Sequence, residues 1–122
     1  MITAKWIGKA YGINRRLETT KYGHIYSSRV YKGFKRGLEW VLYGANPQHL
    51  TYKCPVRVDI DYTISRQRDI DSLTKPVLDA LQNANIILND SMAVDLRQRK
   101  HIKKRGELDE IEIRVQEADD GC

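Results

Sequence analysis

The chain has 122 residues, of which 41% are hydrophobic and 30% are charged. This length suits a single domain with one core, so we expect one domain over residues 1–122. Without a long apolar run or a signal-like N-terminus, we expect a cytoplasmic protein with no membrane span. The 21 lysines and arginines exceed the 16 acidic residues, and the formal net charge of +5 is compatible with nucleic-acid binding. Cys54 and Cys122 are expected to be free thiols.

The first third of the chain predicts a strand, a hairpin and a helix. Apolar residues alternate over residues 2–6 and indicate a strand. Basic and aromatic residues flank Lys21-Tyr22-Gly23 and predict a hairpin, which is either an ordinary surface hairpin or a flap that touches DNA. Ser27 or Ser28 is positioned to cap a helix that Gly44 ends. The apolar face of this helix consists of Val30, Phe34, Leu38, Val41 and Leu42.

The next segment alternates apolar and polar residues from Tyr52 to Ile64, which predicts a long strand with one buried face. Its outer face carries Asp59 and Asp61, in an Asp-x-Asp-x-Thr motif that resembles that of haloacid-dehalogenase phosphotransferases. In that family the motif lies on a loop after an apolar strand, whereas the strand pattern here continues through it. We therefore expect both aspartates to be exposed strand residues, paired with basic neighbours.

The C-terminal part predicts two more strands, over about residues 94–102 and 108–115, joined by a turn at 103–106. We expect them to pair as a hairpin, with Glu110 and Glu112 opposite the basic face of the first strand. The polar residues 116–122 are expected to fray. The predicted class is α/β (α+β), with a small mixed or antiparallel sheet packed against two helices.

The most informative stretch surrounds the start of the second predicted helix. Pro76 is tolerated only near a helix start, so the helix should begin close to Ser72. Asp69 and Asp71 then precede it, where the positive end of the helix dipole favours carboxylates and where an aspartate is often only a cap. Lys75 indicates more than a cap, because a cation in the first turn is unfavourable unless anions or a bound phosphate compensate it.

A third aspartate, Asp90, follows the apolar run of this helix. Three carboxylates held close together repel one another unless they bind a cation. Magnesium suits such a set, because it needs few protein carboxylates and keeps several waters, and manganese favours the same ligands. Asp69, Asp71 and Asp90 are therefore the predicted ligands of Mg²⁺, with Mn²⁺ as a substitute.

This stretch resembles the RusA family of Holliday junction resolvases. The residues that carry the resemblance are Arg68-Asp-Ile-Asp-Ser-Leu-Thr-Lys75, Val77-Leu-Asp-Ala-Leu81 and Asn89-Asp90. Their spacing is that of the family pattern, and the resemblance covers about residues 52–116. Two positions depart from it: Ser72 stands where the family commonly has asparagine, and a proline-rich N-terminal entry is reduced to Gly12-Ile13-Asn14.

The resemblance implies a RusA-like fold and a magnesium-dependent, structure-selective endodeoxyribonuclease in DNA recombination and repair. Such an enzyme resolves four-way junctions by paired symmetric nicks, as a homodimer. Asp69, Asp71 and Asp90 would be catalytic together with Lys75, which would hold the scissile phosphate or offset its developing charge. The residues expected to bind branched DNA are Arg15, Arg16, Arg66, Arg68, Arg97, Arg99, Lys103, Lys104 and Arg105.

Two other classes stay open. A non-catalytic DNA-binding protein would keep the basic surfaces and use the aspartates only as caps, and magnesium-dependent strand cleavage separates it from a nuclease. A small metal-dependent nucleotide phosphohydrolase would use the same aspartates. It would hydrolyse free nucleotides and have little affinity for branched DNA.

Overall fold

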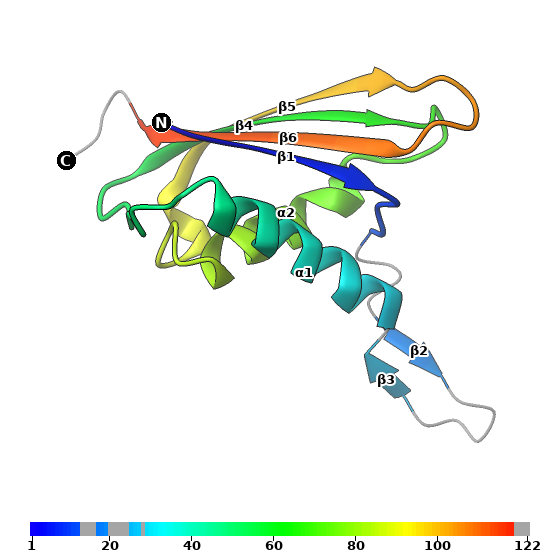
Figure 1. Ribbon diagram of the computed structural model, residues 1–122, viewed down its shortest axis with the longest axis horizontal. Coiled ribbons are helices and arrows are strands. Elements are labelled where there is room, and N and C mark those ends of the chain that lie inside the picture. The colour runs from blue at the N-terminus through cyan, green and yellow to red at the C-terminus, as the bar shows by residue number, and fades with distance from the viewer. Residues whose placement is uncertain (13–16, 20–24, 28, 119–122) are drawn as a thin grey trace.

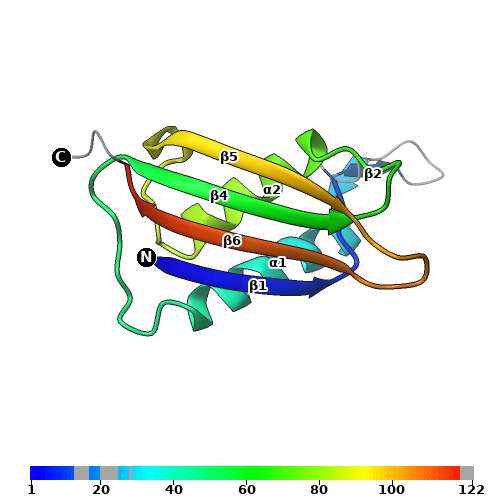
Figure 2. The same cartoon turned by 90° about the horizontal axis from the view of Figure 1, so that it is seen from above.

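A computed structural model describes residues 1–12, 17–19, 25–27 and 29–118. Its centre is a four-stranded sheet of β1 (Ile2–Gly8), β6 (Asp109–Glu117), β4 (Val56–Ile64) and β5 (Ala93–Ile102), in that spatial order. β6 runs antiparallel to both β1 and β4, whereas β4 and β5 are parallel, so the sheet is mixed. Consequently the ends of β1, β4 and β5 and the start of β6 meet at one end of the sheet (Figure 2).

Two helices, α1 (Arg29–Gly44) and α2 (Asp71–Asn83), cover one face of the sheet (Figure 1). A short helix, η2 (Asp90–Met92), leads into β5. β2 (Leu17–Thr19) and β3 (Ile25–Ser27) form a separate antiparallel pair beyond the start of α1. The predicted α+β class, with a mixed sheet and two helices, is confirmed. The turn of the predicted N-terminal hairpin lies outside the described residues.

The core lies between the helices and the covered face of the sheet. Trp6 of β1 packs edge-on against Phe34 of α1, with the ring centroids 4.8 Å apart. Gly37 permits this approach, because a Cβ there would lie 2.8 Å from the Trp6 indole nitrogen. Fully buried side chains from the central strand and from α2 complete the core: Val56, Val58, Ile60, Tyr62, Ile64, Leu73, Val77, Ala80 and Leu81. No helix in the described ranges is long and apolar enough to cross a membrane.

The predicted hairpin between the last two strands is wrong, because β4 lies between β5 and β6. The turn after β5 crosses the end of β4, where the Lys103 amide donates to the Ile64 carbonyl at 2.9 Å. Glu110 therefore pairs with Lys5 of β1, and Glu112 with Arg114 on its own strand, rather than with the basic residues of β5. The most apolar strand takes the central position, where both of its edges are paired.

Two details in and before β4 also differ from expectation. Asp59 and Asp61 pair with basic neighbours as predicted, but neither is exposed. Asp61 is half-buried, and Asp59 is only 6% exposed because the side chains of Arg57 and Arg99 lie over it. Cys54, just before the strand, is disulfide-bonded rather than a free thiol. A pairing between cysteines depends on their separation in space, which no local sequence pattern reports.

Candidate active site

The first turn of α2 forms around Asp69. The Asp71 amide donates to the Asp69 carboxylate at 3.0 Å, and the Ser72 hydroxyl donates to the Asp69 carbonyl at 2.8 Å. The Asp69 carboxylate therefore satisfies one of the backbone amides that a helix start leaves without a partner. The helix begins at Asp71, one residue before the predicted start, and Pro76 is buried inside it.

Lys75 links this turn to the third predicted aspartate. Its ammonium group lies 3.0 Å from the carboxylate of Asp79, one turn further along α2, and 3.7 Å from the carboxylate of Asp90 at the start of η2. Asn89 shapes η2 by accepting a hydrogen bond from the Ser91 amide at 2.9 Å. The structure thus brings Asp90 beside α2, although Asp90 lies fifteen residues beyond Lys75 in the chain.

These contacts keep Lys75 positively charged. The hydrogen bond that the Lys75 ammonium donates to Asp79, the charge of Asp79 and then the charge of Asp90 raise the pKa of Lys75 above its ordinary value. A lysine held in this state suits the binding of a phosphate oxygen, not the removal of a proton. Asp79 also contacts the ammonium group of Lys35 at 3.4 Å. It was missed as a site residue, although its spacing of four residues from Lys75 is the interval at which helical side chains meet.

Asp69 and Asp71 are exposed and Asp90 is half-buried. Among the described residues, no three acidic, histidine or cysteine side chains lie close enough together to hold a metal ion. The donor chemistry nevertheless suits Mg²⁺, which takes one or two carboxylates and completes its shell with water and substrate phosphate. Asp69, Asp71 and Asp90 stay a predicted ligand set.

A cluster of three oxygen atoms fastens α2 to the sheet. The hydroxyl groups of Tyr62 in β4 and of Thr74 in α2 each donate to the side-chain oxygen of Gln98 in β5, both at 2.8 Å. Tyr62 is fully buried, and burial, followed by the nearby charge of Asp71, raises the pKa of its hydroxyl. Thr74 lies between Asp71 and Lys75 in the chain, so this cluster positions the turn that carries both. The sequence had indicated only a core role for Tyr62.

Several of the basic residues predicted to bind DNA have carboxylate partners. Arg97 bonds Asp95 at 3.2 Å and Arg99 bonds Asp61 at 2.9 Å, both on the face of the sheet that the helices leave open. Lys103 lies 2.9 Å from the buried carboxylate of Asp109. Arg15 and Arg16 fall outside the residues that the structure describes.

The remaining predicted DNA-binding residues gather at the end of the sheet where β4 and β5 finish. Arg66, Lys104 and Arg105 are exposed there, and they help to line a hollow of about 440 Å³. The half-buried Arg68 lies on the same loop as Arg66. This loop continues directly into Asp69, so the exposed basic groups and the acidic start of α2 lie at the same end of the molecule (Figure 2).

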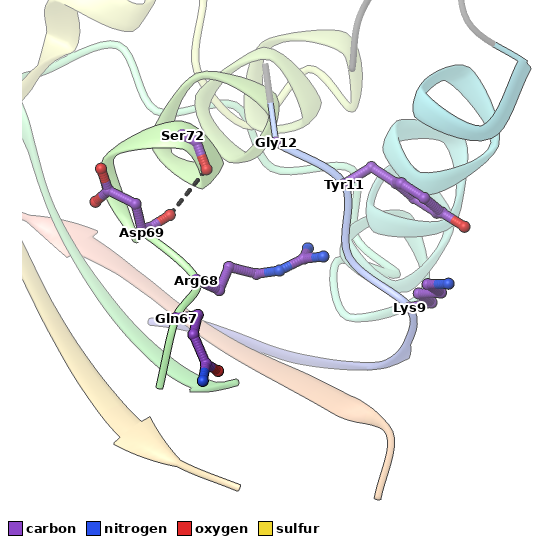
Figure 3. Close-up of a pocket in the computed structure, with 7 residues that line it drawn as sticks. All are labelled: Lys9, Tyr11, Gly12, Gln67, Arg68, Asp69 and Ser72. Atoms are coloured by element: carbon purple, nitrogen blue, oxygen red, sulfur yellow. Dashed lines mark hydrogen bonds between the residues drawn. The ribbon is translucent and has the colours of Figure 1, made fainter. Parts of the chain in front are cut away.

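A larger pocket, of about 620 Å³, opens beside Asp69 (Figure 3). One wall is the segment after β1 and the other is the loop after β4. The residues that line it are Lys9, Tyr11, Gly12, Gln67, Arg68, Asp69 and Ser72. Only Arg68 and Asp69 of this set were candidate site residues, because no local pattern indicates that residues 9–12 lie against residues 67–72.

Comparison with known proteins identifies a family. A family model described as endodeoxyribonuclease RusA matches residues 9–116. The match includes all four predicted catalytic residues, and it also takes in the segment after β1 and helix α1, which the resemblance noted in the sequence did not cover. A search of curated proteins finds no match.

Proposed function

Because the chain belongs to the RusA family of endodeoxyribonucleases, which hydrolyse phosphodiester bonds in Holliday junctions, we propose that it resolves four-way junctions by paired symmetric nicks. We propose further that the reaction depends on a divalent metal ion, Mg²⁺ or Mn²⁺, and serves DNA recombination and repair. The observation that carries this proposal is the charge layout at one end of the sheet. Asp69 and Asp71 lie at the start of α2, Lys75 follows one turn later with its ammonium group beside Asp90, and exposed basic residues lie on the neighbouring loops.

Asp69, Asp71 and Asp90 would hold the metal ion. A divalent ion bound there supplies an activated water and offsets negative charge on the phosphate. Lys75 binds an oxygen of the phosphate that is cut, since its ammonium group already lies next to the Asp90 carboxylate. Asp79 keeps the Lys75 ammonium in this place, because the ion pair between Lys75 and Asp79 is shorter than the one between Lys75 and Asp90.

Arg66, Lys104 and Arg105 bind the DNA backbone in this proposal, together with Arg68. The exposed positions of Arg66, Lys104 and Arg105 around one hollow suit contacts with successive phosphates. Arg97 and Arg99 contribute less, because each is already bonded to a carboxylate of the sheet. Lys103 supports the loop through Asp109 and contributes least.

A homodimer is part of the proposal. A four-way junction presents two symmetry-related strands for cutting, and one active site per chain serves them best as a two-fold pair. Dimerisation would place two acidic sites on the same junction.

The test is cleavage of synthetic four-way, flap and linear duplex DNA by the purified protein, with Mg²⁺, with Mn²⁺ and with a chelator. We expect symmetric nicks in the four-way junction only when metal is present. We expect three single variants, Asp69→Asn, Asp71→Asn and Asp90→Asn, to bind junctions as well as the unmodified protein does. Their cleavage rate should fall by about a thousandfold at least.

Asp95→Asn is the matched control, because Asp95 is a partly exposed aspartate on β5 that bonds Arg97 away from the start of α2. It should cut at the normal rate. Binding of junctions without cleavage in either metal would support the non-catalytic DNA-binding alternative. Hydrolysis of free nucleotides with weak junction binding would support the phosphohydrolase alternative.

A further inference from the structure

The face of α1 that points away from the core carries two exposed aromatic rings. Trp40 is 79% exposed and Tyr43 is 55% exposed, whereas the other tryptophan of the chain, Trp6, lies in the core. Single exposed apolar side chains are common on protein surfaces. Two large rings one turn apart form a patch, however, and such patches mark interaction sites.

The two rings line a groove between the C-terminal ends of α1 and α2, which run side by side (Figure 1). The groove has a volume of about 330 Å³ and is lined by Arg36, Glu39, Trp40, Tyr43, Asn83 and Ala84. The Asn83 amide joins its walls by donating to the Glu39 carboxylate at 2.7 Å. One turn earlier, Lys35 of α1 pairs with Asp79 of α2 at 3.4 Å. Because its walls are bonded to each other, the groove exists before a ligand enters, which lowers the entropic cost of binding.

Toward its N-terminal end the same face of α1 is positively charged. Three exposed cations, Arg29, Lys32 and Arg36, recur at intervals of three and four residues. The interval from Arg36 to Trp40 is also four, so the cations and the indole lie on one side of the helix. After Trp40 the chain has no lysine or arginine until Lys53. This outer face, formed by the three cations with Trp40 and Tyr43, is therefore basic at one end and aromatic at the other.

This division of charge disfavours a nucleic acid strand and a second copy of the chain as the molecule that covers the face. Phosphates on both sides of a stacked base need cations on both sides of the ring, but α1 ends beyond Trp40 at the negative end of its dipole. The Glu39 carboxylate in the groove wall would also repel a phosphate. Two copies packed face to face would bring the cations of both outer faces together, which is costly.

The groove has the composition of a protein-binding site. Tryptophan, tyrosine and arginine contribute most of the binding energy at protein interfaces, and all three line it. A volume of about 330 Å³ lies at the lower end of the range for pockets that bind small organic molecules, so it suits one large side chain of a partner. Clusters of cationic side chains recognise acidic motifs. A segment with an aromatic side chain next to several carboxylates therefore matches both ends of the outer face.

We propose that the outer face of α1 docks an acidic segment of a partner protein. An aromatic side chain of that segment enters the groove beside Trp40, and its carboxylates pair with Arg29, Lys32 and Arg36. The groove lies at the end of α2, about 18 Å along the helix from its acidic start. A docked partner leaves the candidate active site open, so this docking is independent of the proposed nuclease function.

The first experiment selects ligands from a library of random short peptides displayed on phage, with the full chain and its Trp40→Ser variant as parallel targets. Peptides that depend on Trp40 should be enriched about tenfold or more on the unmodified chain, and should combine an aromatic residue with several acidic ones. Trp40 is exposed, so the variant should keep its fold. Equal enrichment on both targets, or Trp40-dependent peptides that are basic or uncharged, would overturn the proposal.

The second experiment measures tryptophan emission as the most enriched peptide, synthesised without tryptophan, is added at physiological salt. Emission should shift to shorter wavelength and be protected from acrylamide, because Trp40 is exposed and Trp6 is buried. Arg36→Glu should weaken binding about tenfold or more. Lys5→Glu is the matched control, an exposed lysine on the open face of the sheet, and should bind normally. Equal weakening in both variants, or no shift with the unmodified chain, would contradict docking on α1.

The same emission distinguishes the other two occupants. Adding oligothymidylate in place of the peptide should leave the emission unchanged, and so should raising the protein concentration. A shift with oligothymidylate and not with the peptide would assign the outer face to single-stranded DNA. A shift that follows protein concentration would assign it to a second copy of the chain, and either result would overturn the proposal.

Discussion

The partners of Lys75 in the structure differ from those that the sequence indicated. Within helix α2 Lys75 has a carboxylate partner in Asp79, and this contact is shorter than the one to Asp90. An ion pair one turn apart on a surface helix is normally worth only a few tenths of a kcal/mol. Its importance here is therefore the direction in which it holds the ammonium group, not the stability that it adds.

Asp79→Asn should consequently loosen Lys75 without unfolding the helix. We expect junction binding to be unchanged and single-turnover cleavage to fall about tenfold, far less than the loss in Asp69→Asn. Quench-flow or gel-based single-turnover rates measure the difference. Equal losses in the two variants would mean that the metal site has been assigned to the wrong aspartates.

The basic residues after β5 divide into a structural and a DNA-binding group. Lys103 neutralises the buried Asp109, so Lys103→Met should lower the free energy of unfolding by about 3 kcal/mol. Lys104 and Arg105 are exposed, so replacing both by alanine should leave stability within about 0.5 kcal/mol of the original.

Lys104 and Arg105 should contribute to DNA binding, although they contribute little to stability. The double variant Lys104→Ala, Arg105→Ala should weaken junction binding and lower the slope of log affinity against log salt by about 2, one per lost phosphate contact. Binding titrations at four salt concentrations measure this slope. An unchanged slope would remove the β5–β6 turn from the DNA surface.

At the scale of elements, the seating of α2 depends on the oxygen cluster of Tyr62, Thr74 and Gln98. Thr74→Val keeps the shape of the side chain but removes its hydroxyl, and should cost about 1 kcal/mol of stability. Cleavage at saturating DNA should fall as well, because the turn that carries Asp71 and Lys75 is less firmly placed.

Thr74→Ser restores the hydroxyl and should recover most of the cleavage rate. Thermal denaturation and rates at saturating DNA, measured on the same samples, separate stability from activity. A Thr74→Val variant that melts earlier but cuts at the full rate would show that the cluster supports only the fold.

On the open face of the sheet, Asp61 of β4 joins β4 to both neighbouring strands. Its carboxylate accepts hydrogen bonds from Arg99 at 2.9 Å, His101 at 2.9 Å and Arg114 at 2.5 Å, on both neighbouring strands. The bond from Arg99, with those from His101 and Arg114, holds the pKa of the Asp61 carboxyl well below its usual range, against the effect of burial. These bonds stabilise the fold only while the carboxyl is ionised.

A depressed pKa contributes stability that is present above the unfolded value of 3.8 and is lost as the pH falls toward the folded value. Asp61→Asn should therefore lower stability at neutral pH by about 1–3 kcal/mol and reduce the loss of stability below about pH 4. Urea denaturation between neutral and acidic pH tests this. A variant with the same acid sensitivity as the parent would assign that sensitivity to other carboxyl groups.

At the scale of the whole molecule, the proposed dimer predicts a solution mass of about twice 14.2 kDa. Light scattering at micromolar concentration, with and without junction DNA, measures it. A mass of one chain under both conditions would contradict paired cutting by a preformed dimer. The nuclease function would survive that result, with the two nicks made by separate molecules.

The sequence by itself determined the elements and the local spacing of the site. Alternation in residues 2–6 and 52–64 and the apolar faces of the helices predicted strands and helices that the structure contains. The structure differs in two details: β4 begins only at Val56, and α1 buries Tyr31 rather than Val30. The two aspartates before α2, and the lysine four residues on, were recognisable because they belong to one turn of chain. Such patterns are readable since strand and helix periods repeat over a few residues.

Only the tertiary structure decided the strand order and the partners of the charged groups. The last two strands are neighbours in sequence and were expected to pair, yet β4 lies between them. Ala10 and Asp109, which together hold one wall of the pocket, are 99 residues apart. Contacts of this kind arise from packing the apolar faces of all elements at once, and no repeat within a few residues of chain encodes them.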